Sequence, residues 1–267
     1  MKVKNKVVVV TGAGSGMGRE LTLELVRRGA SVAALDKRKE TLAETKKLAE
    51  DLNGKVETFV IDITDNTKVL ALPAKIEKVL GKVDALINNA GIIQPFVHVS
   101  ELSLESAHRV MDVNFTGPLQ MVKAFLPGLL ARPEAHILNV SSMGAYAPVP
   151  GQTVYGASKA AINLFTQGLR SELLATKVGV TVAFPGAINT NIAQNSGMAM
   201  PAGADAAESK FKMTEAPVAA KMMVDAIEAN KPRITIGSDA TMMDRLSRLN
   251  PVMAANIIYK QMASLLK

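Results

Sequence analysis

A tyrosine and a lysine four residues apart, Tyr155 and Lys159, carry side chains suited to proton transfer, and Ser142 lies thirteen residues before the tyrosine. Positions i and i+4 share one face of a helix, so we expect the phenol and the ammonium to lie side by side. A positive charge beside a phenol favours the phenolate, which predicts a Tyr155 pKa below its usual value of about 10. Such a tyrosine is a general acid/base, with the Ser142 hydroxyl meeting it from a neighbouring loop. The alternative is a chance pattern on a solvated helix.

A glycine-rich segment near the N-terminus favours the functional interpretation. An apolar β-branched run at 7–10 predicts a buried strand, and Gly12, Gly16 and Gly18 follow it before a helical pattern that ends near Gly29. In a strand–turn–helix context, glycines let a pyrophosphate approach the backbone, and the helix N-terminus favours its charge. The spacing Gly-x-x-x-Gly-x-Gly differs from the common Gly-x-Gly-x-x-Gly fingerprint. The alternative is a flexible turn that binds nothing.

Asp36 ends a second apolar strand, about 20 residues past the glycines. A carboxylate at this place can accept hydrogen bonds from ribose hydroxyls and would repel a 2′-phosphate. Lys37 and Arg38 follow directly and could attract that phosphate, unless they only begin a solvated helix. We therefore expect NAD(H) to be favoured, with NADP(H) as the alternative.

Strand and helix patterns alternate along the rest of the chain. Strands are expected at 32–35, 56–61, 83–87, 135–140 and 178–184, with helices ending near Leu80 and spanning 104–131 and 153–176. Pro73 is expected to kink the first of these helices or delay its start. The alternation predicts an α/β fold, a Rossmann-type doubly wound parallel sheet with helices on both faces. The chemistry-bearing residues fall at the carboxyl ends of strands, where such sheets bind ligands.

The motifs in this order resemble the short-chain dehydrogenase/reductase family over about residues 5–237. The matching positions are Thr11-Gly12-x-x-x-Gly16-x-Gly18, Asp62, Asn88-Asn89-Ala90-Gly91, Asn114, Ser142, Tyr155-x-x-x-Lys159 and Pro185-Gly186 with Thr190. The resemblance implies proton transfer by Tyr155, a substrate oxygen held by Ser142, and a water held by Asn114 behind Lys159. It also implies that Lys159 binds the nicotinamide ribose.

The same resemblance implies a set of cofactor-binding residues. They are Gly12, Ser15, Gly16, Met17 and Gly18 at the pyrophosphate, Asp62 and Ile63 at the adenine, Asn89, Ala90 and Gly91 beside the cofactor, and Pro185, Gly186, Ile188 and Thr190 at the nicotinamide, together with Asp36, Tyr155 and Lys159. Three alternatives stay open. Asn114 could be only a helix breaker, Ser141 competes with Ser142, and Asn88 is expected to brace its turn.

Composition narrows the function further. The 267 residues fit a single domain, 1–267, and the absence of cysteine excludes disulfides and thiolate catalysis. A net charge of +7 with 4% aromatics and no Trp argues against nucleic acid as a partner. His98, His108 and His136 lack ligand spacing, so no metal is expected. No signal-peptide core and no membrane span are expected either. We expect a cytoplasmic location.

Two segments are expected to add to the basic fold. Residues of about 189–216 are rich in Ala, Met, Gly and Asn, which predicts a substrate lid. Its Met198, Met200 and Met213 suit an apolar or bulky ketone. The alternative is that these methionines only pack the lid. Residues of about 240–267 predict a helical extension broken at Pro251. It could dock on its own or a neighbouring subunit of a homodimer or homotetramer, cover the site, or, less expected, contact a membrane surface.

These observations predict an oxidoreductase that transfers hydride between NAD(P)(H) and a secondary alcohol or ketone. An epimerase or dehydratase of the same fold is one alternative. A nucleotide-sensing protein without turnover is another, although it would be expected to lack Tyr155 or Lys159, and both are present.

Overall fold

The computed structural model describes residues 1–190, 192–197 and 213–262. The elements in chain order are β1 (Val7–Thr11), α1 (Gly16–Arg27), β2 (Ser31–Asp36), α2 (Lys39–Leu48), β3 (Lys55–Val60), α3 (Asn66–Leu70), α4 (Leu72–Leu80), β4 (Ala85–Asn88), α5 (Leu104–Met111), η1 (Asp112–Thr116), α6 (Gly117–Leu130), β5 (Ala135–Val140), η2 (Met143–Ala145), α7 (Thr153–Glu172), β6 (Val178–Pro185), β7 (Ile188–Asn189), α8 (Ile192–Asn195), β8 (Thr214–Glu215), α9 (Ala216–Glu228), β9 (Arg233–Ile236), α10 (Ser238–Leu249) and α11 (Pro251–Met262).

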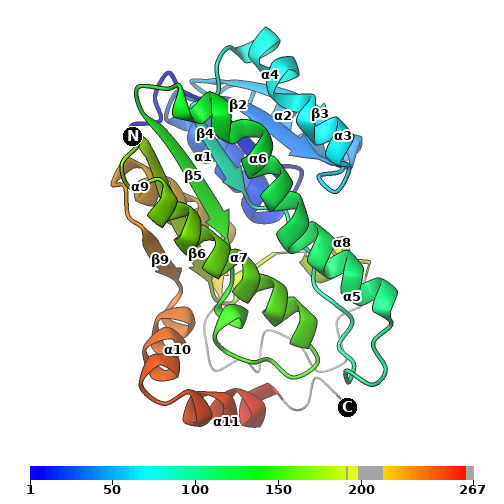
Figure 1. Cartoon of the computed structure of the whole chain (residues 1–267). Coiled ribbons are helices and arrows are strands. Elements are labelled where there is room, and N and C mark those ends of the chain that lie inside the picture. The colour runs from blue at the N-terminus through cyan, green and yellow to red at the C-terminus, as the bar shows by residue number, and fades with distance from the viewer. Residues whose placement is uncertain (191, 198–212, 263–267) are drawn as a thin grey trace.

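Seven parallel strands form the central sheet in the order β3-β2-β1-β4-β5-β6-β9. Helices α1 and α9 pack on one face of the sheet, and α4, α6 and α7 pack on the other (Figure 1). The predicted doubly wound sheet with helices on both faces is therefore confirmed. Strand order reverses between β1 and β4, and a crevice at the carboxyl ends of strands on either side of such a reversal is the usual ligand site.

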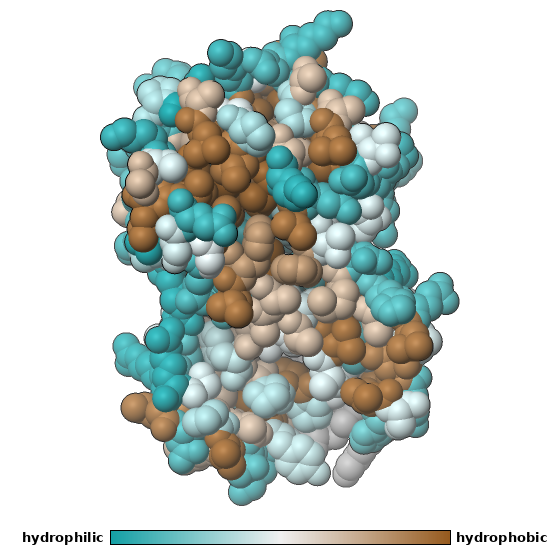
Figure 2. All heavy atoms as spheres, in the orientation of Figure 1, coloured by the Kyte–Doolittle hydropathy of each residue, from teal (hydrophilic) through white to brown (hydrophobic). Residues whose placement is uncertain are grey.

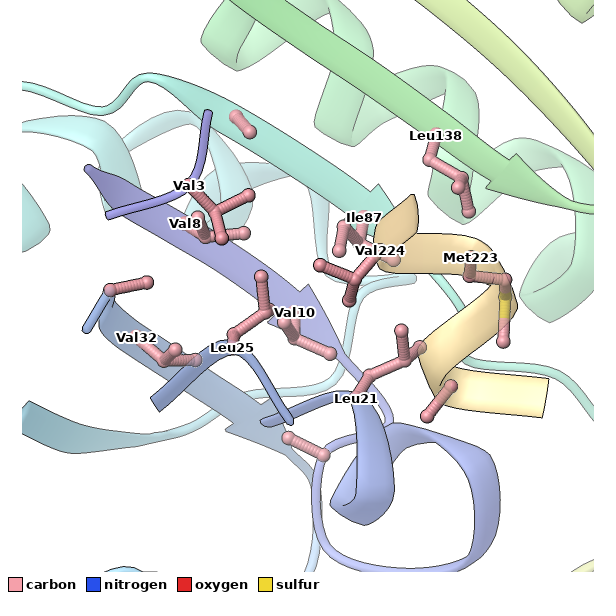
Figure 3. Packing of buried hydrophobic residues seen from close by; sticks show 14 of the residues in the cluster. Val3, Val8, Val10, Leu21, Leu25, Val32, Ile87, Leu138, Met223 and Val224 are labelled. Carbon is pink, nitrogen blue, oxygen red and sulfur yellow. The ribbon is translucent and has the colours of Figure 1, made fainter. Parts of the chain in front are cut away.

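Strand β1 shows how the sequence fixes these two layers. Successive side chains of a strand point to opposite faces, so Val8 and Val10 join the core under α1 and α9, while Val7 and Val9 join the core under α4, α6 and α7. Figure 3 shows Val10 beside Leu25 of α1, and Val8 beside Val3. All four valines are buried, and each contributes roughly 1.5–3 kcal/mol of hydrophobic free energy. The strand ends are thereby held in a fixed register.

The helix expected over 104–131 is interrupted, which corrects the prediction. A π-helical turn, η1, separates α5 from α6. Pro118 has no N–H and cannot donate to the carbonyl of Asn114, which the α-helical pattern would require. The widened turn places the Asn114 side chain in the interior, where it is buried.

The segment around Pro73 folds as two short helices, α3 and α4, with Pro73 in the first turn of α4. That position tolerates proline because the first helical amides have no intrahelical acceptor. Other predicted ends shift by a few residues: β4 begins at Ala85 rather than 83, and α7 ends at Glu172 rather than 176.

The C-terminal residues form α10 and α11, and Pro251 begins the second helix, as the expected break at this proline requires. Met243, Ala254 and Ile258 pack on Ala147, with Met143 and Val149 at the edge of the same cluster. The two helices thus pack against the segment that follows Ser142 in the same chain. No helix in the described part of the chain is both long and apolar enough to cross a membrane.

Candidate active site

A cleft of about 810 Å³ opens at the carboxyl ends of β1, β2, β3 and β4. Many of the residues predicted to bind a dinucleotide line it: Gly12, Ser15, Gly16, Met17, Gly18, Asp36, Asp62, Ile63, Asn89, Ala90, Gly91 and Thr190. They come from segments that are far apart in the sequence. The sheet topology therefore gathers the predicted cofactor residues around one cavity.

The glycine-rich loop lies too close to other backbone atoms for side chains at Gly12 and Gly18. A Cβ at Gly18 would lie 1.9 Å from the carbonyl oxygen of Gly12. Gly12 has a φ of +68°, and a Cβ there would lie 2.9 Å from the Ala90 Cα. Ser15 precedes α1 with extended backbone, and its side chain does not cap the helix. The loop thus presents the helix N-terminus and backbone amides to the cleft, a suitable cradle for a pyrophosphate.

Thr11 fastens the Asn89–Gly91 loop to the end of β1. Its hydroxyl accepts hydrogen bonds from the amides of Asn89 and Ala90, both at 3.0 Å, and its carbonyl accepts from the Asn89 side chain at 3.0 Å. Asn88 donates to the Asn139 side chain at 2.8 Å and so links β4 to β5, rather than bracing its own turn. At the far end of the cleft, the Asp62 carboxylate accepts from the amide and hydroxyl of Thr64.

Asp36 lines the cleft and is fixed there by backbone donors. Its carboxylate accepts from the amides of Gly14 at 3.1 Å and Arg38 at 3.0 Å. The Arg38 guanidinium donates to Asn195 at 2.8 Å and to the Ser15 hydroxyl at 3.1 Å. Asn195 also donates to Ser15, at 3.0 Å, so α8 is joined to the glycine-rich loop across the cleft. An acidic and a basic group, Asp36 and Arg38, therefore both line the cleft just where β2 ends.

Ser142 and Tyr155 meet beside the cleft, as the spacing predicts. The Ser142 hydroxyl acts to lower the Tyr155 pKa, and Ser142 Oγ accepts from the amide of Gly144 at 3.0 Å. A Cβ at Gly144 would lie 3.2 Å from Tyr155 Cε1 and 3.5 Å from Ser142 Oγ, so both side chains lie against this glycine. Ser141 is buried and donates to the carbonyl of Lys159 at 2.7 Å. That contact occupies the Ser141 hydroxyl in holding the helix, which favours Ser142 as the group that meets a substrate.

Lys159 is buried on the same helix, and its Nζ lies 5.9 Å from the centre of the Tyr155 ring. The ammonium donates to the carbonyl of Val140 at 3.1 Å. Burial lowers the pKa of Lys159 to about 8, because an apolar environment disfavours the charged form.

The sequence predicts a lowered Tyr155 pKa, and this prediction is wrong. Burial raises the pKa of the Tyr155 phenol, and the Ser142 hydroxyl only partly opposes that effect. The sequence pattern places the lysine near the ring but does not include the desolvation of the phenol. At neutral pH the phenol is therefore protonated, the state that a proton donor requires.

The buried Lys159 predicts a specific pH dependence of stability. Its pKa is about 8 in the folded protein and close to 10.5 when exposed, so the unfolded chain holds the extra proton between these values. We expect this group to increase the stability of wild type, relative to Lys159→Met, as pH rises from about 8 to about 10.5. Urea unfolding followed by circular dichroism measures this difference. Lys47→Met, at an exposed lysine, should show no such trend, and a pH-independent difference for Lys159→Met would contradict the assignment.

Asn114 is fully engaged through its side chain. Its Oδ1 accepts from the amide of Ile92 at 2.9 Å, and its Nδ2 donates to the Ile92 carbonyl and to Ser158 Oγ, each at 2.9 Å. A Cβ at Gly91 would lie 3.2 Å from Lys159 Nζ and 3.3 Å from Asn114 Oδ1. The glycine thus allows three predicted site residues to come together. These contacts show Asn114 bracing the site, and the water expected on it stays a prediction.

The residues predicted at the nicotinamide begin with Pro185, the last residue of β6, and continue just after the strand. Gly186 donates to the Ile236 carbonyl at 2.9 Å, and its missing side chain leaves room for the Asp239 carboxylate. Thr190 lies against the glycine-rich loop, 3.4 Å from where a Gly16 Cβ would be. Pro185, Gly186 and Ile188 do not line the cleft itself. Met198 and Met200 lie outside the described residues.

Several residues at the site were not predicted from the sequence. Ile92, His108, Arg109, Asp112, Val113 and Asn195 line the cleft, and Gln94 contacts the helix that carries Tyr155. His136 is buried in the sheet, where burial lowers its pKa to about 3, and it pairs with Thr181 at 2.8 Å. No cluster of three potential metal ligands occurs among the described residues.

Comparisons with known proteins agree with this geometry. Residues 6–200 match the short chain dehydrogenase family. The oxidoreductase SadH of Mycobacterium tuberculosis is 34% identical over 252 residues, which cover 92% of this chain and 91% of SadH. The chain therefore belongs to the short-chain dehydrogenase family and is an oxidoreductase of that family.

Two solved structures are similar over nearly the whole chain. A short-chain dehydrogenase from Burkholderia cenocepacia in complex with NADP has a TM-score of 0.80 and 28% identity, covering 97% of this chain and 99% of that one. A short-chain dehydrogenase/reductase from Burkholderia phymatum in complex with NAD has a TM-score of 0.81 and 25% identity, covering 93% and 94%.

Proposed function

We propose that this protein transfers a hydride between NAD(P)(H) and a secondary alcohol or ketone. The observation that carries the proposal is the convergence of the Ser142 and Tyr155 side chains on Gly144, beside the buried Lys159. Two hydroxyls that converge in this way suit one substrate oxygen. The intact Ser142, Tyr155 and Lys159 set favours redox chemistry over a binding protein without turnover.

The protein groups divide the work at the substrate oxygen. Ser142 donates a hydrogen bond to the carbonyl oxygen, and Tyr155 transfers its proton there as negative charge develops. In the reverse direction, Tyr155 takes the proton of the alcohol. The nicotinamide, when bound, supplies or accepts the hydride. Lys159 adds a positive charge that stabilises the tyrosinate, at the cost of its own desolvation.

The cleft fits a dinucleotide, and we propose that NAD(H) is preferred. The close approach of the loop at Gly12 and Gly18 supports a pyrophosphate site. The Asp36 carboxylate, held by two backbone amides, supports ribose hydroxyls as its partners. Arg38 is the competing signal for NADP(H), and its guanidinium already binds Ser15 and Asn195.

The test is NADH and NADPH oxidation over a panel of ketones of increasing size, with the matching alcohols and oxidised cofactors for the reverse direction. We expect turnover of at least one ketone and a higher kcat/KM for NADH. Tight NADH binding with no turnover of any ketone or alcohol would instead support the binding-protein alternative.

The cofactor preference has its own variant. Asp36→Asn removes the charge that repels a 2′-phosphate, so we expect the NADPH/NADH ratio of kcat/KM to rise on the order of tenfold, equivalent to about 1.4 kcal/mol. Asp51→Asn is the control, since Asp51 is exposed and does not line the cleft. An unchanged ratio in Asp36→Asn would show that Asp36 does not select the cofactor.

Further proposals accompany this function. We propose a single domain over 1–267, with a substrate lid at about 189–216 and a bulky or apolar substrate. We propose a cytoplasmic homodimer or homotetramer. Figure 2 shows apolar side chains gathered over α6 and α7, where Leu130 and Leu164 are exposed. An exposed apolar face supports contact with another subunit.

A further inference from the structure

We infer that Gln94 is a positioning residue that sets the place of Tyr155 by capping its helix from another part of the chain. The Gln94 side chain is completely buried. Its Oε1 accepts from the amides of Val154 at 2.8 Å and Tyr155 at 2.9 Å. The inference rests on the proposed function, in which Tyr155 is the proton-transfer group.

The two amides belong to the first turn of α7, where the helix offers no acceptor. Helix α7 begins at Thr153, and the first helical bond runs from the Gly156 amide to the Gln152 carbonyl. The side chain of Gln152, at the N-cap, does not cap the helix and donates to the Gln94 carbonyl at 2.8 Å instead. Gln94, about 60 residues away, therefore takes the place of the local cap.

The carbonyl side of Tyr155 is held as well. Ser158 Oγ donates to the Tyr155 carbonyl at 2.7 Å and accepts from Asn114 Nδ2 at 2.9 Å. Asn114 in turn binds both the amide and the carbonyl of Ile92. The segment 92–94 thus holds the amide of Tyr155 through Gln94, and its carbonyl through Asn114 and Ser158.

This closed set of hydrogen bonds couples the catalytic helix to the cofactor side of the site. Ile92 follows the Asn89–Gly91 loop that lines the cleft, and the Ile93 amide donates to Ser196 Oγ, just after α8, at 3.1 Å. Gln94 does not line the cleft itself. Its loss should therefore disturb the placement of Tyr155 much more than cofactor binding.

The test compares Gln94→Met, which removes the acceptor, with Gln94→Glu, which keeps it. Among the described residues, Gln94 Nε2 has no hydrogen-bond partner, so glutamate loses no contact there. In the whole protein, we expect the Val154 and Tyr155 amides to exchange with deuterium at least about tenfold faster in Gln94→Met, measured by NMR. Gln94→Glu should retain the wild-type rates. Gln167→Met, at an exposed position of the same helix, is the control.

Catalysis gives the second measurement. We expect Gln94→Met to lower kcat at least about tenfold with the NADH Kd within about threefold of wild type, and Gln94→Glu to restore most of kcat. The inference would be overturned if the two amides exchanged at wild-type rates in Gln94→Met, or if kcat fell equally in Gln94→Met and Gln94→Glu. Absent turnover in wild type would refute the proposed function, while amide exchange would still decide whether Gln94 caps the helix.

Discussion

Tyr155→Phe is expected to lower kcat for ketone reduction by about 10²–10⁴-fold, the usual contribution of a general acid. The substitution removes only the phenol hydroxyl, and leaves the ring beside Lys159. Because burial raises the Tyr155 pKa, the phenol is protonated at neutral pH and is ready to donate. NADH binding should change little, since Tyr155 does not line the cleft. Steady-state kinetics and NADH titration by fluorescence measure the two effects.

Tyr259→Phe is the matched control for this experiment. Tyr259 lies on α11 and is largely exposed, so the same loss of a hydroxyl should leave kcat unchanged. If Tyr155→Phe kept more than about a tenth of wild-type turnover, another group would have to supply the proton. If Tyr155→Phe lost NADH binding as well as turnover, the result would point instead to a distorted cleft.

Local patterns predicted much of this site. Strand–turn–helix order places the glycine-rich loop, and helical spacing places Tyr155 and Lys159 on one face. The carboxyl ends of the parallel strands bring Asp36, Asp62 and Asn89 to one cleft, which follows from the alternation of strands and helices. In each case, a short-range rule or the sheet topology determines the position.

The features that could not be predicted depend on tertiary contacts. Gln94 reaches the amide of Tyr155 across 61 residues, and Arg38 reaches Asn195 across 157. A polar side chain at either position has no local signal for such a partner. The direction of the Tyr155 pKa shift was wrong for the same reason, because desolvation depends on everything packed around the phenol.

Gly18→Ala should have the largest effect on cofactor binding. Its Cβ would lie 1.9 Å from the Gly12 carbonyl oxygen and 2.6 Å from Asn89 Nδ2, so the loop backbone must move. We expect NADH affinity to fall on the order of 100-fold, and the free energy of unfolding to fall by about 2–4 kcal/mol. Calorimetric titration with NADH and urea unfolding measure the two quantities.

Gly168→Ala separates the clash from any general effect of adding a methyl group. Gly168 lies within α7, and a Cβ there would meet no atom within 4 Å. The same substitution should therefore raise stability by roughly 0.5–1 kcal/mol, since alanine is the better helix former. A loss of stability in Gly18→Ala and a gain in Gly168→Ala would show that the close approach of the loop to the Gly12 carbonyl requires glycine at position 18. A Gly18→Ala protein that bound NADH as wild type does would mean that the loop can open without losing the pyrophosphate site.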